Sequence, residues 1–384
     1  MSFHQADDVR TIISRFTKTS PGLTFLQKLV IMNYHLLSIC EDTMELTVKH
    51  QEYQLVDLLK LFFCLCVVAI HSNILPDYAL VSAIVRLAVP FFFVTSGFFL
   101  GKKVLIVEKI DVWPTIKKYC LRLLKPFLAF SAITITENLI TGLLNGQPFF
   151  EAVGIQIWYL LVYPRGALWY LSACMVGALL LIPFLRMNKL NLSLLFGMGL
   201  YGIALLCNNY YFLIKDTKFA YYVQKYLNYF CSARNGVFVG FLFLALGIKC
   251  AQLFFGKENK MKRRCIYPLL LLSLCLYFAE AYLVERLAQG IFREDGGCFV
   301  LQIIAVPLLL LAALKTELPI SNRLSRLLRD CSVGVYLLHK PLLWILGWFV
   351  LPNYANFAIA VVLCLTICLV TYRFKKEPFY SLLR

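Results

Sequence analysis

Long apolar segments alternate with short polar ones along nearly all of the chain after residue 50. A helix needs about 20 mainly apolar residues to cross the hydrocarbon core of a bilayer. Ten segments meet this condition, and the pattern predicts an all-α polytopic membrane protein built as a bundle of about ten transmembrane helices. We place these helices at about 54–74, 80–100, 124–144, 167–186, 190–208, 234–252, 266–284, 298–315, 330–350 and 354–373.

The composition supports this fold class and excludes soluble ones. Of the 384 residues, 60% are hydrophobic and only 15% are charged, whereas a soluble globular chain carries about 45–50% apolar and about 25% charged residues. A disordered chain could not keep so much apolar surface in water. We therefore expect a multi-pass protein of the cell membrane, with membrane lipid as its first partner.

The net charge of +17 is explained by topology rather than by nucleic acid. If the N-terminus is cytoplasmic, the connections on the cytoplasmic side hold 27 Lys and Arg residues and those on the outer side hold 8. This asymmetry is typical of the positive-inside rule. Ten crossings also return the C-terminus to the cytoplasm, and no nucleic-acid partner is predicted.

The chain divides into three parts. Residues 1–50 form a polar, then modestly apolar extension that we expect in the cytoplasm or on the inner leaflet; an eleventh crossing is disfavoured, and a start mis-called upstream of Met44 stays open. Residues 51–375 form the membrane domain, and residues 376–384 form a cytoplasmic tail. The 14 cysteines show no metal-binding spacing, so no metal site is predicted.

The longest outer connections, 145–166 and 209–233, are rich in aromatic residues. Such residues often lie at the membrane interface, and they can also floor a sugar-binding cleft. The composition favours the interface, but both interpretations stay open.

Ionisable side chains inside membrane helices are costly and mark candidate functional sites. Lys60 and His71 lie on the first helix, separated by ten apolar residues. Eleven residues turn a helix about 20° past three full turns, so both side chains point to the same face, about 16 Å apart along the axis. Alternatively, Lys60 reaches lipid phosphate and His71 caps the helix.

The second helix carries Arg86, Pro90 and Ser96. Arg86 lies near the outer end, where it either reaches the interface or serves a site. Pro90 is expected to kink the helix, and Ser96 next to Gly97 is typical of close helix packing.

Other polar residues add to this set. Arg122 and Lys125 lie one turn apart before the third helix, where they either set topology or bind a phosphate. Trp169 and Arg234 lie at the outer ends of two helices. His339, within an apolar helix beside a lysine and a proline, predicts a polar cavity.

The motifs Lys60-x10-His71, Val89-Pro90-Phe91-Phe92-Phe93, Arg122-Leu-Leu-Lys125-Pro126, Trp169-Tyr170-Leu171, Arg234-Asn235-Gly236 and Tyr336-Leu-Leu-His339 occur in the order seen in acyltransferase family 3. The sequence resembles these integral-membrane enzymes over about residues 52–375. Many of them O-acetylate surface polysaccharides and other exported molecules. Lys125 departs from the arginine usual in the family, which keeps the charge but loses the bidentate fork.

The resemblance implies an acyl-coenzyme A donor, usually acetyl-coenzyme A. Lys60, Arg122 and Lys125 would bind its phosphates, and His71 would remove the proton of the attacking hydroxyl. It also implies a cell-envelope carbohydrate or similar hydroxyl acceptor and an extracytoplasmic acyl-handling partner. The cavity would be lined by Arg86, Ser96, Trp169, Arg234, Tyr336 and His339.

Two other functions fit the same residues. A transporter or flippase would move a glycan precursor or an organic anion without covalent chemistry, although we find no internal repeat typical of transporters. A membrane-embedded sensing or anchoring module is a third reading, and the lack of an attached catalytic domain argues against it.

Overall fold

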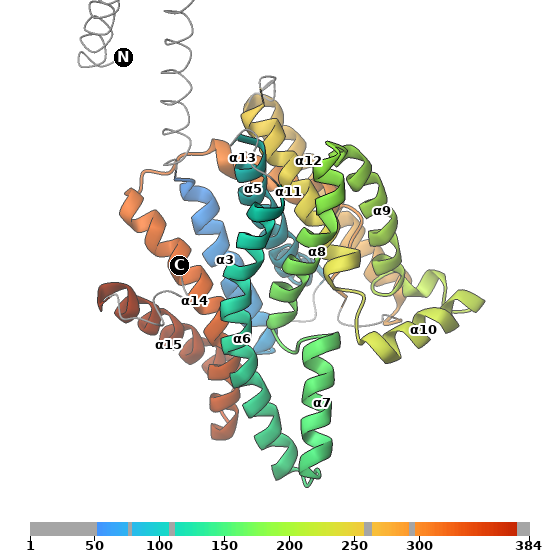
Figure 1. The fold of residues 1–384 in the computed structure, drawn as a ribbon, viewed down its shortest axis with the longest axis vertical. Coiled ribbons are helices and arrows are strands. Elements are labelled where there is room, and N and C mark those ends of the chain that lie inside the picture. The colour runs from blue at the N-terminus through green and yellow to red at the C-terminus, as the bar shows by residue number, and fades with distance from the viewer. Residues whose placement is uncertain (1–51, 76–78, 107–111, 257–262, 292–295, 375–384) are drawn as a thin grey trace, which may run out of the picture. The chain divides into compact units, whose positions relative to one another are not determined.

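The computed structural model describes residues 52–75, 79–106, 112–256, 263–291 and 296–374 (Figure 1). Within these ranges every regular element is a helix. The helices belong to one unit of the chain, which begins at Tyr53. The predictions for residues 1–50 and 376–384 lie outside the described residues.

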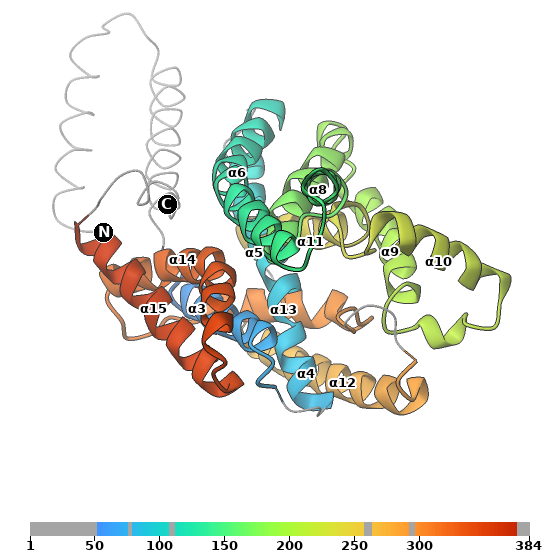
Figure 2. The ribbon, with the colours of Figure 1, turned by 90° about the horizontal axis from the view of Figure 1, so that it is seen from below.

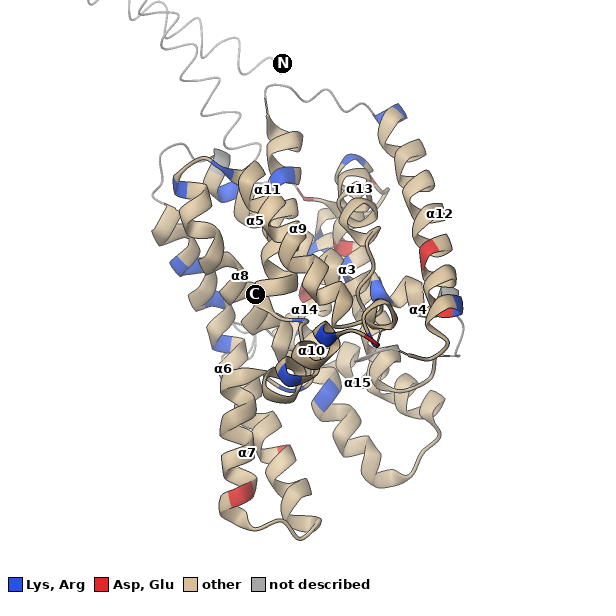
Figure 3. Cartoon of the chain, turned by 90° about the vertical axis from the view of Figure 1, so that its right-hand side faces the viewer, with Lys and Arg blue, Asp and Glu red and all other residues tan. Residues whose placement is uncertain are grey.

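Each predicted crossing forms helix. In chain order the crossings correspond to α3 (Gln54–His71), α4 (Ala79–Arg86) with α5 (Ala88–Ile106), α6 (Val112–Leu144), α8 (Leu168–Arg186), α9 (Leu190–Leu206), η2 (Gly236–Gly240) with α11 (Phe241–Phe255), α12 (Arg263–Ala288), α13 (Gln302–Lys315), α14 (Asn322–Leu346), which continues into the short η3 (Gly347–Phe349), and α15 (Asn353–Phe374). Among the described residues, seven helical segments are long and apolar enough to cross a membrane, and α7, α9 and α13 are shorter apolar helices. The all-α polytopic membrane fold is thus confirmed, and Figure 3 shows its long uncharged helical stretches.

The two connections predicted to be the longest on the outer side are partly helical. The first contains α7 (Phe149–Val162), which packs beside the end of α6 (Figure 1). The second contains η1 (Tyr211–Leu213) and α10 (Lys218–Phe230). α7 has 14 residues, too few to cross a membrane. α10 has 13 residues, which are also too few.

The second crossing is broken at Leu87, between α4 and α5, and not at Pro90 as expected. Pro90 is the third residue of α5. The first N–H groups of a helix have no partner within the helix, so proline is tolerated in its first turn. The break therefore leaves Arg86 at the end of α4.

α5 and α11 cross with their backbones in contact. A Cβ atom at Gly97 would collide with the carbonyl oxygen of Leu244, and one at Gly247 would collide with that of Val94. Glycines at such crossings let two membrane helices approach closely. The close packing expected at Gly97 is therefore present.

α3 packs along α14, and α15 covers α14 on another side (Figure 2). α3 and α14 run in the same direction, because residues early in α3 contact residues early in α14 and the end of α3 contacts a later turn. This parallel pair brings together the first and ninth predicted crossings.

Candidate functional site

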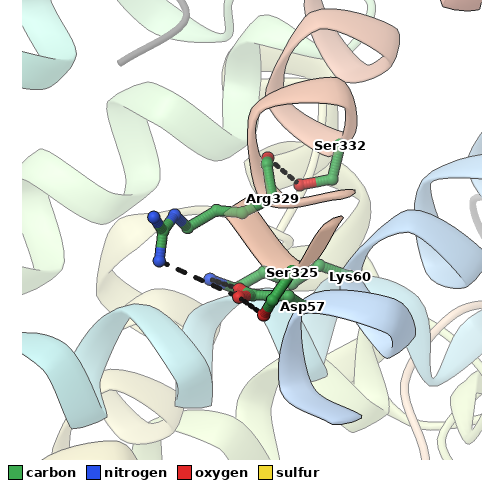
Figure 4. Close-up of polar contacts among 5 residues, drawn as sticks. All are labelled: Asp57, Lys60, Ser325, Arg329 and Ser332. Atoms are coloured by element: carbon green, nitrogen blue, oxygen red, sulfur yellow. Dashed lines mark hydrogen bonds and ion pairs between the residues drawn. The ribbon is translucent and has the colours of Figure 1, made fainter. Parts of the chain in front are cut away.

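The starting ends of α3 and α14 meet at a buried carboxylate (Figure 4). Asp57 is 2% exposed, and the Ser325 hydroxyl donates a hydrogen bond of 2.8 Å to its Oδ2 atom. The Lys60 ammonium lies 3.8 Å from Oδ1, and the Arg329 guanidinium lies 3.8 Å from Oδ2. One anion and two cations thus link the two helices, since a buried charge requires such partners.

The residues predicted to bind the donor are only partly brought together. Lys60 lies over the ring of Phe99, 4.8 Å from its centroid. Arg122 on α6 is near enough for its charge to act on Lys60. Lys125 is exposed one turn further along α6 and has no hydrogen bond or ion pair within the described residues. The site also contains Asp57 and Arg329, which are not among the predicted site residues.

The other end of the α3–α14 pair carries two stacked imidazoles. The rings of His71 and His339 have centroids 5.3 Å apart and an interplanar angle of 26°. His339 is fully buried, and its Nδ1 atom donates to the carbonyl oxygen of Val335 at 3.1 Å. That bond places the proton on Nδ1. His339 Nε2 then faces the interior with no hydrogen-bond partner among the described residues.

The contacts between α3 and α14 repeat every seven residues on both helices. This spacing is the repeat of helices that pack side by side along their length. Three pairs of residues follow this repeat: Asp57 with Ser325, Cys64 with Ser332, and His71 with His339. In the middle pair the Cys64 thiol donates to the carbonyl oxygen of Ser332 at 3.1 Å. Lys60 and His71 therefore both lie near α14, about 16 Å apart along the axis of α3.

A series of aromatic rings leads away from the histidine pair. Tyr336 lies 6.1 Å from His339, and its hydroxyl donates to the carbonyl oxygen of Ala167. Tyr170 lies 5.6 Å from Tyr336. The series continues through Phe93, 4.6 Å from Tyr170, to Trp169, 6.1 Å from Phe93. Two predicted cavity residues, Tyr336 and Trp169, are thereby connected to His339.

The predicted arginines meet at the end of this series. The Arg234 guanidinium lies over the ring of Trp169, 5.6 Å from its centroid. A Cβ atom at Gly297 would lie 3.2 Å from Arg234 Nη1 and 3.8 Å from Arg86 Cδ, so both arginine side chains flank this glycine. The side chain of Asn235 fixes the start of η2 by accepting hydrogen bonds from two backbone N–H groups of that helix.

Ser96 is placed in a packing contact rather than beside His71. Its hydroxyl is hydrogen-bonded to the Tyr119 hydroxyl at 2.7 Å, and both lie next to Cys174. These residues come from α5, α6 and α8. Their geometry holds the three helices together and offers no base to activate Ser96.

Other ionisable groups have structural partners. Glu280 accepts hydrogen bonds from the Tyr210 hydroxyl and from the Leu301 N–H, the latter at 2.8 Å, and so fixes the start of α13. Burial, together with this bond, raises the pKa of Tyr210, which keeps its hydroxyl a donor. The charges of Glu137 and Lys340 act on each other between α6 and α14.

The arrangement offers two kinds of chemistry. One end of the α3–α14 pair presents cations to an anion, and the other presents imidazoles that can exchange protons. Among the described residues there is no group of three or more His, Cys, Asp or Glu side chains able to hold a metal ion.

Comparisons with known proteins relate the chain to one family. Residues 53–373 match the family model described as an acyltransferase domain, that of acyltransferase family 3. Part of the chain is also similar to a serine/alanine racemase from Enterococcus gallinarum, with 27% identity over 202 residues. An amino-acid racemase from Enterococcus faecalis is 25% identical over 257 residues.

These alignments cover 50% and 62% of this chain. The chain spans only 28% and 33% of the length of those relatives. No solved structure matches the chain. The racemase names thus belong to much longer proteins, of which this chain resembles a part.

Proposed function

Because the chain belongs to acyltransferase family 3, we propose that it moves an acyl group, usually acetyl, from acyl-coenzyme A to a hydroxyl of a cell-envelope polysaccharide or similar exported acceptor. The observation that carries the proposal is the α3–α14 pair. It holds Lys60 in a cationic cluster at one end and His71 against His339 at the other.

The two ends suit the two parts of the donor. Coenzyme A is strongly anionic, and the Lys60 cluster with nearby Arg122 offers positive charge to its phosphates. The thioester lies at the far end of a flexible arm. The separation of about 16 Å between Lys60 and His71 allows that end to reach the imidazoles while the phosphates stay bound.

The chemistry needs one base. His71 removes the proton of the acceptor hydroxyl as the oxygen attacks the thioester carbonyl. A carbon–oxygen bond forms, the carbon–sulfur bond breaks, and coenzyme A leaves as a thiolate that takes the proton from His71. His339 holds the His71 ring through stacking.

The orientation in the cell follows from the donor. Acyl-coenzyme A is cytoplasmic, so the Lys60 end is proposed to face the cytoplasm, with both termini on that side of the cell membrane. Arg86, Trp169 and Arg234 would then lie toward the acceptor. An extracytoplasmic partner would complete the handover where the acceptor is large.

The test is transfer of label by the purified chain in vesicles. Acetyl-coenzyme A with a labelled acetyl group is supplied with candidate acceptors to the wild type, to His71→Ala and to Ser72→Ala. His71→Ala should lose transfer by about 100-fold or more, the usual contribution of a general base. Ser72→Ala, the adjacent buried polar position, should keep it.

The outcomes test acyl transfer and the role of His71 separately. If the wild type transfers no label to any acceptor, acyl transfer is wrong. If the wild type and His71→Ala transfer label equally, acyl transfer stands and His71 is not the base.

A second candidate function is carriage of an amino acid across the membrane without covalent chemistry. It is favoured by the name of one racemase relative, which refers to serine and alanine. Vesicles holding the chain would then take up labelled serine in the absence of any acyl donor, and uptake equal to that of empty vesicles would exclude it.

A further inference from the structure

We propose that Arg329 is the second arm of a phosphate clamp whose first arm is Lys60, and that Asp57 positions both arms. This inference rests on the proposed function, because the ligand is a phosphate group of the acyl donor. Neither Arg329 nor Asp57 belongs to the motifs that the sequence presents. The clamp lies where α3 and α14 begin to pack together (Figure 4).

The two cations flank one carboxylate without closing on it. Lys60 approaches Oδ1 and Arg329 approaches Oδ2, each at 3.8 Å. That distance is beyond hydrogen-bond range, so the attraction of each cation to Asp57 is Coulombic. Within the described residues no hydrogen bond engages the Lys60 ammonium, which keeps its donors for another acceptor.

The charge of the cluster favours a further anion. Lys60 and Arg329 both approach one carboxylate, and Arg122 adds positive potential at Lys60. A phosphate oxygen between the two arms would be attracted by these cations. Arginine is suited to this role, because different N–H groups of its planar guanidinium can face Asp57 and a phosphate at the same time.

Exposure increases from the carboxylate outward. The side chain of Asp57 is 2% exposed, that of Lys60 is 17% exposed and that of Arg329 is 35% exposed. A ligand can therefore reach both cations while the carboxylate stays sealed. Arg323 and Arg326 precede Arg329 at three-residue spacing on α14 and form a basic approach to it.

Asp57 is itself fixed, which makes it a positioning residue. The Ser325 hydroxyl donates to the same oxygen that Arg329 approaches, at 2.8 Å. The carboxylate therefore cannot rotate away from either arm. It holds two like charges close together, which would otherwise repel each other, and so keeps the clamp formed before the donor arrives.

The experiment compares two donors that differ in their phosphates. Acetyl-coenzyme A and acetyl-pantetheine, which has no phosphate, are supplied to the full chain in vesicles. The variants are Arg329→Gln, Arg329→Lys and, as a matched loss of charge on α12, which packs mainly against α13 and α4, Arg264→Gln. Binding of unacylated coenzyme A is measured separately by calorimetry.

We expect Arg329→Gln to raise KM for acetyl-coenzyme A by about 10-fold or more, the loss of a charge-assisted hydrogen bond, with kcat within about 2-fold. KM for acetyl-pantetheine should not change. Arg329→Lys, which keeps the ion pair with Asp57 and therefore the fold, should give a smaller rise. Arg264→Gln should resemble the wild type with both donors.

Two results would overturn the clamp. One is an unchanged KM for acetyl-coenzyme A in both Arg329 variants. The other is an equal rise for both donors, which would mean that Arg329 only holds the helices together. If the wild type transfers no acetyl group but binds coenzyme A in an Arg329-dependent way, the clamp stands and the proposed reaction fails.

Discussion

The imidazole of His71, the last residue of α3, stacks on that of His339 from α14, with ring centroids 5.3 Å apart. The residues are far apart in the chain, and the two helices meet only in the folded protein. His339 is completely buried and bonded to its own helix, so it is the fixed member of the pair. The position of the His71 ring thus depends on a residue of the ninth predicted crossing.

This dependence predicts different effects for two substitutions of His339. His339→Phe keeps a flat ring against His71, and we expect transfer within about 3-fold of the wild type. His339→Ala removes the ring, and we expect kcat to fall by about 10-fold or more because the base is no longer held. Initial rates of label transfer check this. Equal losses in both variants would mean that a nitrogen of His339 is needed, and not its ring.

We expect the protein to lose stability when the negative charge of Asp57 is removed. Asp57→Asn leaves two cations close together, and removing one partner of a buried pair costs about 3–5 kcal/mol. Since Arg329 is one-third exposed, we expect about 2–3 kcal/mol. The free energy of unfolding is measured by detergent titration in mixed micelles. Glu285→Gln, the same change at an exposed position of α12, is the control and should have little effect.

The α5–α11 crossing predicts a strict requirement for glycine. In Gly97→Ala or Gly247→Ala the new methyl group meets a backbone carbonyl of the facing helix, so the helices must separate. We expect a loss of at least about 2 kcal/mol, comparable to other overpacking changes. Gly199→Ala on α9 has open space around it and should be neutral or slightly stabilising. Similar behaviour of all three variants in thermal unfolding would contradict the close contact.

The proposed orientation predicts the labelling of two thiols. In a background without other cysteines, Cys265 at the start of α12 and an introduced Asn145→Cys after α6 are both exposed. A membrane-impermeant maleimide added to right-side-out vesicles should label Asn145→Cys directly. It should label Cys265 only after permeabilisation. The reverse pattern would place the Lys60 cluster on the outer side.

The helices could be predicted from the sequence because apolar length alone determines most of them. α3, α8 and α15 match their predicted ranges to within three residues at each end. Helices without that signal were missed. α7 is too short to cross a membrane. α10 has no long apolar run, although the spacing of its buried residues, Ala220 and Val223, by one turn could have indicated a helix.

The site was predictable only one helix at a time. The spacing of Lys60 and His71 placed them on one face, but nothing in α3 indicates that His339 and Arg329 meet that face. A signal was nevertheless present. Asp57 lies one turn before Lys60, and an acidic residue so near a basic one in an apolar helix suggests a buried pair. Arg329 gave no such signal, because it lies among basic residues that the topology already explains.

The ion cluster has a consequence for biogenesis. Asp57 and Lys60 leave the ribosome with the first crossing, whereas Ser325 follows 268 residues later. At ordinary rates of synthesis this delay is roughly 15 to 50 seconds. Throughout that interval the Asp57 carboxylate lies in a nascent membrane segment without Ser325 and Arg329. A chain stalled before α14 is synthesised would therefore hold Asp57 and Lys60 in the membrane without their partners from α14. Membrane quality control can use this polar cluster to distinguish the stalled chain from the completed protein.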